Sequence, residues 1–134
     1  MNTFKNYLNE SIDYVNMMVS QYRNISSKPK EITISKYIKG SAKACFINSE
    51  KYVMKHPDCK YVVGIIMYTG VPITHAFVKC GNDYIDVTLE KNEDTIYYSV
   101  VELSFEEMES ISDSTKHGRG HIDLYSINKF YREK

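Results

Sequence analysis

The sequence predicts an α+β fold, with N-terminal helices packed on a small antiparallel sheet. Two observations predict it. Near the N-terminus, apolar residues recur every three or four positions, and from residue 60 onward, apolar segments of strand length are separated by short turns. A chain of 134 residues is long enough to bury one core, so we expect a single domain over residues 1–134.

The first expected helix covers residues 3–23, "TFKNYLNESIDYVNMMVSQYR", because one stripe of it is apolar. Residues 32–41, "ITISKYIKGS", fit either a short strand or a helical turn. A second helix is expected over residues 42–56, with Ser41 as its N-cap and Pro57 enforcing its end.

Four segments then read as strands: residues 60–70, 74–80, 84–88 and 95–103. The short turns between them favour antiparallel pairing. Ser104, three residues before Glu107, forms a capping-box pattern that predicts a short helix. The tail of residues 121–134, "HIDLYSINKFYREK", fits either a strand or a helix.

Composition excludes several classes of partner. Seventeen basic residues balance 17 acidic ones, so the chain has no overall charge that would attract nucleic acid or an anionic membrane. No apolar stretch approaches the roughly 20 residues of a membrane span. The first residues lack the pattern of a secretory signal, and we expect a cytoplasmic protein. The abundance of Lys, Ile, Asn and Tyr hints at an AT-rich bacterial or phage source.

The segment "PITHAFVKCGNDYIDVT" places His75 and Asp86 on an expected hairpin. If the turn holds only residues 81–82, the two side chains are diagonal neighbours on one face, with backbones roughly 7–8 Å apart. A loop of residues 81–83 would put them on opposite faces. In the first register the other face carries only apolar residues: Ala76, Val78, Ile85 and Val87.

A carboxylate bonded to an imidazole fixes its tautomer and leaves the second nitrogen for a nucleophile. Cys45 is the best candidate for that nucleophile, because the start of a helix offers N–H groups and a positive dipole end that stabilise a thiolate. The same N–H groups can receive the oxyanion of an acyl intermediate. Cys59 and Cys80 are less well placed, and an odd number of cysteines makes free thiols the default expectation.

A helix cysteine, a strand histidine in "HAF" and an aspartate in "YIDVT" resemble the transglutaminase-like branch of the papain-like family. The resemblance covers residues 41–88 and implies a papain-like core with Cys45 as nucleophile, His75 as base and Asp86 as orienting acid. The sequence departs from the family in three places. Phe77 stands for the usual tryptophan, Val87 stands for the usual proline, and the Cys45 to His75 interval is short.

The resemblance implies a thiol-dependent acyl-transfer enzyme, a protease, amidase, deamidase or transglutaminase, with a protein or peptide-like substrate. Lys39 occupies the position where papain-type peptidases keep a glutamine, which disfavours that subtype. The alternative is a non-catalytic binding or inhibitor module on the same fold. The substrate and the oligomeric state stay open.

No cofactor or metal is expected. His117 and His121 in "HGRGH" have a spacing that suits metal ligands on a helix, but the intervening glycines oppose a helix there. The segment is expected to be a flexible loop near a cleft or a phosphate-contacting turn. The tyrosines, including Tyr97 and Tyr98, are expected to fill strand positions.

Overall fold

The computed structural model describes residues 3–134, with side chains from residue 11 onward. This part of the chain contains four helices and six strands and confirms the α+β class. In chain order they are α1 (Thr3–Ser20), β1 (Lys30–Ile32), β2 (Ile34–Tyr37), α2 (Cys45–Lys55), β3 (Lys60–Tyr68), β4 (Val71–Cys80), β5 (Asp83–Asp86), β6 (Thr95–Leu103), α3 (Phe105–Thr115) and α4 (Leu124–Arg132).

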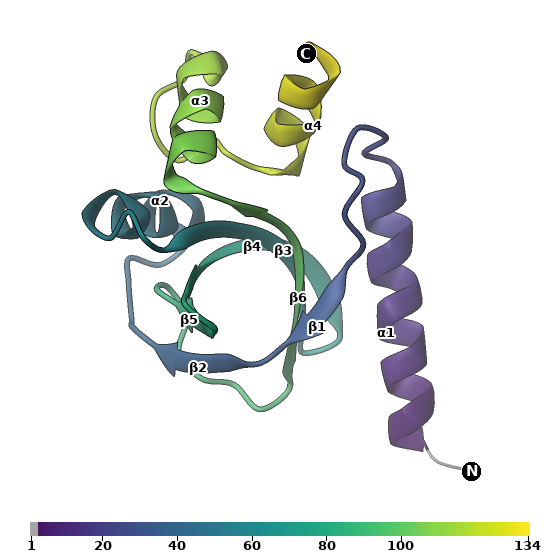
Figure 1. Ribbon diagram of the computed structural model, residues 1–134. Helices are drawn as coiled ribbons and strands as arrows, with labels where there is room; N and C mark the ends of the chain where they lie inside the picture. Colours follow the sequence, from purple (N-terminus) through teal and green to yellow (C-terminus); the bar gives the residue numbers. More distant parts are fainter. Residues whose placement is uncertain (1–2) are drawn as a thin grey trace.

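The six strands form one sheet in the order β1-β6-β3-β4-β5-β2, and the sheet curls strongly on itself (Figure 1). The helices lie outside the curl, with α1 on one side and α2, α3 and α4 around another (Figure 1). The expectation of a wholly antiparallel sheet is wrong at one edge, because β2 pairs with β5 in parallel. A parallel pair needs a long connection, and here α2, β3 and β4 lie between the two strands in the chain.

Apolar side chains fill both faces of the sheet. The outer face packs against the helices through residues that include Val63, Ala76 and Val78. The inner face of the curl holds a second, more aromatic cluster: Ile34, Val62, Ile66, Phe77, Tyr84 and Tyr97. Because successive residues of a strand face opposite ways, this double burial explains why β3 is apolar at nearly every position.

Helix α2 begins later than the sequence suggests. Its N-cap is Ala44, no side chain caps it, and Ser41 lies outside the helix. Lys43 explains the difference, since its backbone φ of 60° is left-handed and cannot belong to the helix. The late start makes Cys45 the first residue of α2.

The two C-terminal helices both start with a capping box. In α3 Ser104 and Glu107 cap each other's backbone N–H groups, as predicted. In α4 Asp123 and Ser126 do the same, which resolves the open tail in favour of a helix. Reciprocal caps of this kind satisfy N–H groups that a helix start otherwise leaves free.

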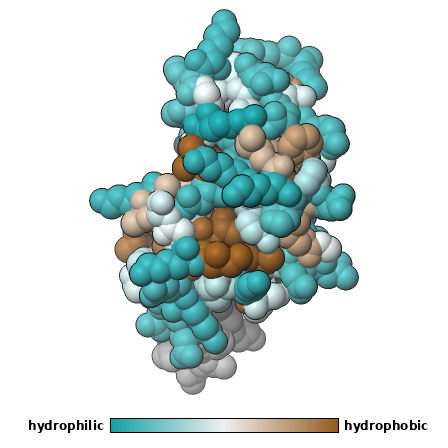
Figure 2. Space-filling model, turned by 90° about the vertical axis from the view of Figure 1, so that its left-hand side faces the viewer, coloured by the Kyte–Doolittle hydropathy of each residue, from teal (hydrophilic) through white to brown (hydrophobic). Residues whose placement is uncertain are grey.

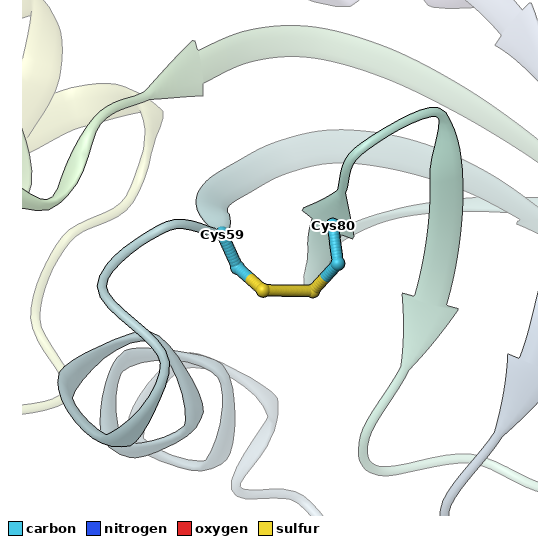
Figure 3. Close-up of a disulfide and its surroundings, with 2 residues drawn as sticks. All are labelled: Cys59 and Cys80. Atoms are coloured by element: carbon cyan, nitrogen blue, oxygen red, sulfur yellow. A yellow bond between two sulfur atoms is a disulfide. The ribbon is translucent and has the colours of Figure 1, made fainter.

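The expectation of free thiols is wrong for two cysteines, because Cys59 and Cys80 form a disulfide (Figure 3). The register of the β3–β4 hairpin is the reason. Lys60 pairs with Lys79, so the next residue outward on each strand is a cysteine, and their Cα atoms lie 4.3 Å apart. Oxidising compartments favour disulfides, so the cysteines do not support the cytoplasmic location expected from the sequence.

Among the helices described, none has both the length and the apolarity needed to cross a bilayer.

Candidate functional site

The hairpin turn holds two residues, and this decides which side chains meet. Cys80 pairs with Asp83, and Gly81 between them has a φ of 62° that suits a glycine. His75 and Asp86 therefore lie on the same face of the sheet, the inner face of the curl. Nε2 of His75 is 2.8 Å from Oδ2 of Asp86, and both side chains are buried.

The carboxylate of Asp86 has a hydrogen-bond partner on every side. Oδ1 accepts the backbone N–H groups of Thr88 and Leu89, at 2.9 and 3.0 Å. Oδ2 accepts the hydroxyl of Tyr97 at 2.5 Å as well as His75. Burial alone would raise the pKa of Asp86, but the hydrogen bonds and the charge of His75 hold it below 3.8. Asp86 is thus a fixed, buried anion.

His75 connects this anion to Cys45, the free cysteine in the part of the chain that the structure describes. The thiol of Cys45 lies close enough to the imidazole to affect its pKa, and since Nε2 faces Asp86, Nδ1 is the nitrogen left for the thiol. Burial lowers the pKa of His75, but the interactions with Asp86 and Cys45 outweigh burial and raise it to about 9. The site therefore favours a protonated imidazole beside the Asp86 carboxylate.

The start of α2 leaves polar backbone groups open beside the thiol. The first hydrogen bond within the helix runs from the N–H of Asn48 to the carbonyl of Ala44, at 2.8 Å. The N–H groups of Cys45 and Phe46 precede that bond and have no acceptor inside the helix. A helix N-terminus of this kind stabilises negative charge on a thiolate or on an oxygen nearby.

Asn48 ties the start of α2 to the segment that follows Asp86. Its Nδ2 donates to the carbonyl of Ser41 and to Oγ1 of Thr88, each at 3.1 Å. Gly40 completes the junction, because a Cβ there would lie 2.3 Å from the carbonyl oxygen of Val87. These contacts, which the sequence did not reveal, set the position of the thiol relative to the histidine and the carboxylate.

Aromatic rings enclose the imidazole. Phe77 lies parallel to the ring of His75 with centroids 6.3 Å apart, and Tyr97 meets it edge-on at 6.1 Å. The expectation that Tyr97 merely fills a strand position is wrong, since its hydroxyl binds Asp86. Alternation along β6 places Tyr97 on the inner face, but the residue it meets depends on two strand registers that no local signal gives.

A pocket of about 740 Å³ opens next to these residues. Apart from Tyr68 of β3, its lining residues come from segments that also carry one of the three side chains. Residues 39–43 precede Cys45, Ile73 lies two positions before His75 on the same face of β4, and residues 88–92 follow Asp86. None of the three side chains lines the pocket itself, but the segments next to them do.

Figure 2 shows the side of the molecule that lies on the left in Figure 1, where α2 and the loop before it are found. Apolar side chains gather near the middle of this side, bordered by hydrophilic ones (Figure 2). An apolar surface with a polar rim is typical of faces that bind other molecules.

The "HGRG" segment joins the loop after α3 to helices α2 and α3 through ion pairs and a hydrogen bond. Arg119 binds the buried carboxylate of Glu50 at 2.6 Å and also pairs with Glu109, while the N–H of Gly120 donates to Glu50 at 3.0 Å. The guanidinium of Arg119 is thus occupied by two carboxylates, which contradicts the expectation that this segment contacts a phosphate. His117 and His121 lie with ring centroids 5.5 Å apart, and no cluster of three metal-binding side chains occurs in the described residues.

No family model, no curated protein and no solved structure matches the chain. The assignment of the candidate site therefore depends on its geometry alone.

Proposed function

We propose that this protein is a thiol-dependent acyl-transfer enzyme of the papain-like type, in its transglutaminase-like branch. One observation carries the proposal: the imidazole of His75 is bonded to Asp86 through Nε2 and lies near enough to Cys45 for the thiol to affect its pKa. Nucleophile, base and orienting acid in this arrangement are the parts that cysteine acyl transfer requires. The order of helix cysteine and two adjacent antiparallel strands is also the order of that family.

The reaction follows from these positions. The thiolate of Cys45 attacks an acyl carbon, and the open N–H groups at the start of α2 stabilise the oxyanion. When the C–N bond of an amide breaks, the imidazolium of His75 gives its proton to the departing amine. Water or a second amine then attacks the thioester, His75 takes the proton of that nucleophile, and the C–S bond breaks to restore the thiolate.

Asp86 acts without transferring a proton. It accepts the Nε2 hydrogen of His75, which keeps Nδ1 directed at the thiol, and its charge stabilises the imidazolium. Ala42, Ile73 and Leu89 in the pocket lining give an apolar surface that suits a side chain of a protein or peptide substrate.

The test has two stages. Alkylation with iodoacetamide at mildly acidic pH, read by peptide mass spectrometry, should modify Cys45 much faster than a thiol exposed by unfolding, because the imidazolium of His75 stabilises the thiolate. His75→Ala should remove this advantage. Intact-mass analysis after incubation with candidate proteins then separates hydrolysis, deamidation and cross-linking by the mass change.

The control is Cys45→Ala in a variant whose melting temperature matches the wild type. It should abolish every mass change. Retention of the protein's biological effect in Cys45→Ala would favour a non-catalytic binding module, because a surface that only holds a partner does not need the sulfur.

A further inference from the structure

The pocket bordered by the loop before Cys45 carries an excess of positive charge. Three lysines line it, and Glu90 is its one acidic lining residue: the lysines are Lys39, Lys43 and Lys91. Lys39 forms an ion pair with Glu90 at 3.3 Å. Within the part of the chain whose side chains are described, neither Lys43 nor Lys91 has an ion pair. Two cationic side chains therefore remain for a bound molecule.

The same pocket has an apolar side. Ala42, Ile73 and Leu89 line it, and Ile73 on β4 is 40% exposed although its neighbour His75 is buried. Exposed apolar surface next to a reactive group offers a place for a substrate side chain. A ligand that fits this pocket has both apolar and anionic parts.

The backbone holds Lys43 at the rim at a cost. Its φ of 60° is left-handed, a conformation that is unfavourable for a residue with a Cβ and that glycine adopts freely. The left-handed turn lies two residues before Cys45 and sets the start of α2. Glycine would serve the turn better, so the turn alone does not account for a lysine at this position.

We propose that the pocket selects an acidic peptide segment as acyl donor, with a carboxylate near Lys43 and Lys91 and an apolar side chain against Ile73 and Leu89. This inference rests on the proposed function, since it names the substrate class of the same thiol. Opposite charges across a rim of this kind steer binding more than they add to affinity.

Two alkylating reagents test the charge directly. Iodoacetate and iodoacetamide react with a thiolate in the same way, by displacing iodide, and differ in that iodoacetate is an anion. Their rate ratio at Cys45 reports how strongly the pocket attracts negative charge. His75 contributes equally in wild type and lysine variants, so the change in the ratio isolates the lysines.

Replacing Lys43 and Lys91 by Gln should lower the iodoacetate-to-iodoacetamide ratio by about threefold for each lysine, the size of an exposed ion pair. The rate with iodoacetamide should hardly change. Added salt should lower the ratio in the wild type and have less effect in the double variant. Lys129→Gln on α4 is the matched control, because Lys129 is exposed and lines a different pocket.

Lys43→Gly protects the test against misfolding, because glycine adopts the left-handed turn without strain while the charged side chain is removed. A ratio unchanged in both double variants, with Gln or Gly at position 43, would overturn the proposal. The ratio is also measured at alkaline pH, where an accessible thiol is ionised without help from His75. If Cys45 is alkylated slowly at mildly acidic pH, the acyl-transfer function is rejected. If the iodoacetate-to-iodoacetamide ratio at alkaline pH still depends on the lysines, the anion-attracting pocket is kept.

Discussion

Tyr97 donates its hydroxyl hydrogen bond to Oδ2 of Asp86, at 2.5 Å, and this is the same oxygen that binds Nε2 of His75. The two donors lie on different strands, β6 and β4, so the carboxylate links the inner faces of both. Burial and the bond to Asp86 raise the pKa of Tyr97 well above 10, which keeps the phenol a donor at any working pH.

We predict that Tyr97→Phe destabilises the fold by about 2 kcal/mol, because a buried hydrogen bond to a charged group contributes roughly 1.5–3 kcal/mol. Turnover should fall through kcat, with KM unchanged, since Tyr97 does not line the pocket. Urea unfolding and steady-state kinetics measure the two effects. Tyr125→Phe serves as control, because Tyr125 is 66% exposed. If kcat is unaltered in a folded Tyr97→Phe protein, the hydroxyl of Tyr97 has no role in turnover and contributes only to the fold.

Asp86→Asn should leave the fold in place and slow acyl transfer by a factor on the order of 10⁴, as in the serine triad. Asn keeps an oxygen for the N–H groups of Thr88 and Leu89. Its NH₂ group then faces Nε2 of His75, which must give up its hydrogen there and carry it on Nδ1 instead. The imidazole can no longer accept the thiol proton.

The measurement is kcat on purified variants with matched melting temperatures. Asp83→Asn, at the exposed start of the same strand, is the matched control and should behave as wild type. Equal activity in the two variants would remove Asp86 from the proposed mechanism.

Stability should depend on pH through His75. Its pKa is raised from 6.5 to about 9 on folding, so the folded state holds a proton that the unfolded chain releases between these values. The contribution is complete below about pH 6.5 and disappears as pH rises through 9. Denaturant unfolding at several pH values from 6 to 10 should show this loss.

His75→Gln is the control, because it removes this titration and leaves the other ionisable groups. The difference in unfolding free energy between wild type and His75→Gln should shrink as pH rises. A difference that stays constant across the range would contradict the proposed charge state of the imidazole.

Loss of the disulfide should cost about 3 kcal/mol, since a bond that closes a loop of this length typically contributes 2–4 kcal/mol. The two cysteines are 21 residues apart and join the open end of the β3–β4 hairpin. Urea unfolding of the double variant Cys59→Ser/Cys80→Ser, compared with wild type, measures the loss. A phosphine reductant should destabilise the wild type and leave the double variant unaffected.

Iodoacetamide labelling of Cys45 should continue in the folded double variant, because the disulfide lies outside the pocket. A wild type whose stability does not respond to reductant would show that the two thiols are unpaired in solution.

Local patterns in the sequence determined the α+β class and most elements. Alternation along "HAFVKC" separated the side chains that pack on the outer face from those that share the inner face with His75. The capping box at Ser104 marked the start of α3. For His75 and Asp86 the sequence left two registers open, a turn of residues 81–82 or a loop of residues 81–83. The structure has the two-residue turn, which leaves one pairing between its strands.

Contacts between segments far apart in the chain were decided by the tertiary structure. Pairing of β2 with β5, the disulfide and the bond from Tyr97 to Asp86 each depend on how distant strands are placed side by side. Periodicity within one segment shows which face a residue occupies and carries no information about its partner on another strand. The sequence therefore determined the type of each candidate side chain and the element that carries it, and the turn length and the curl of the sheet decided which of them meet.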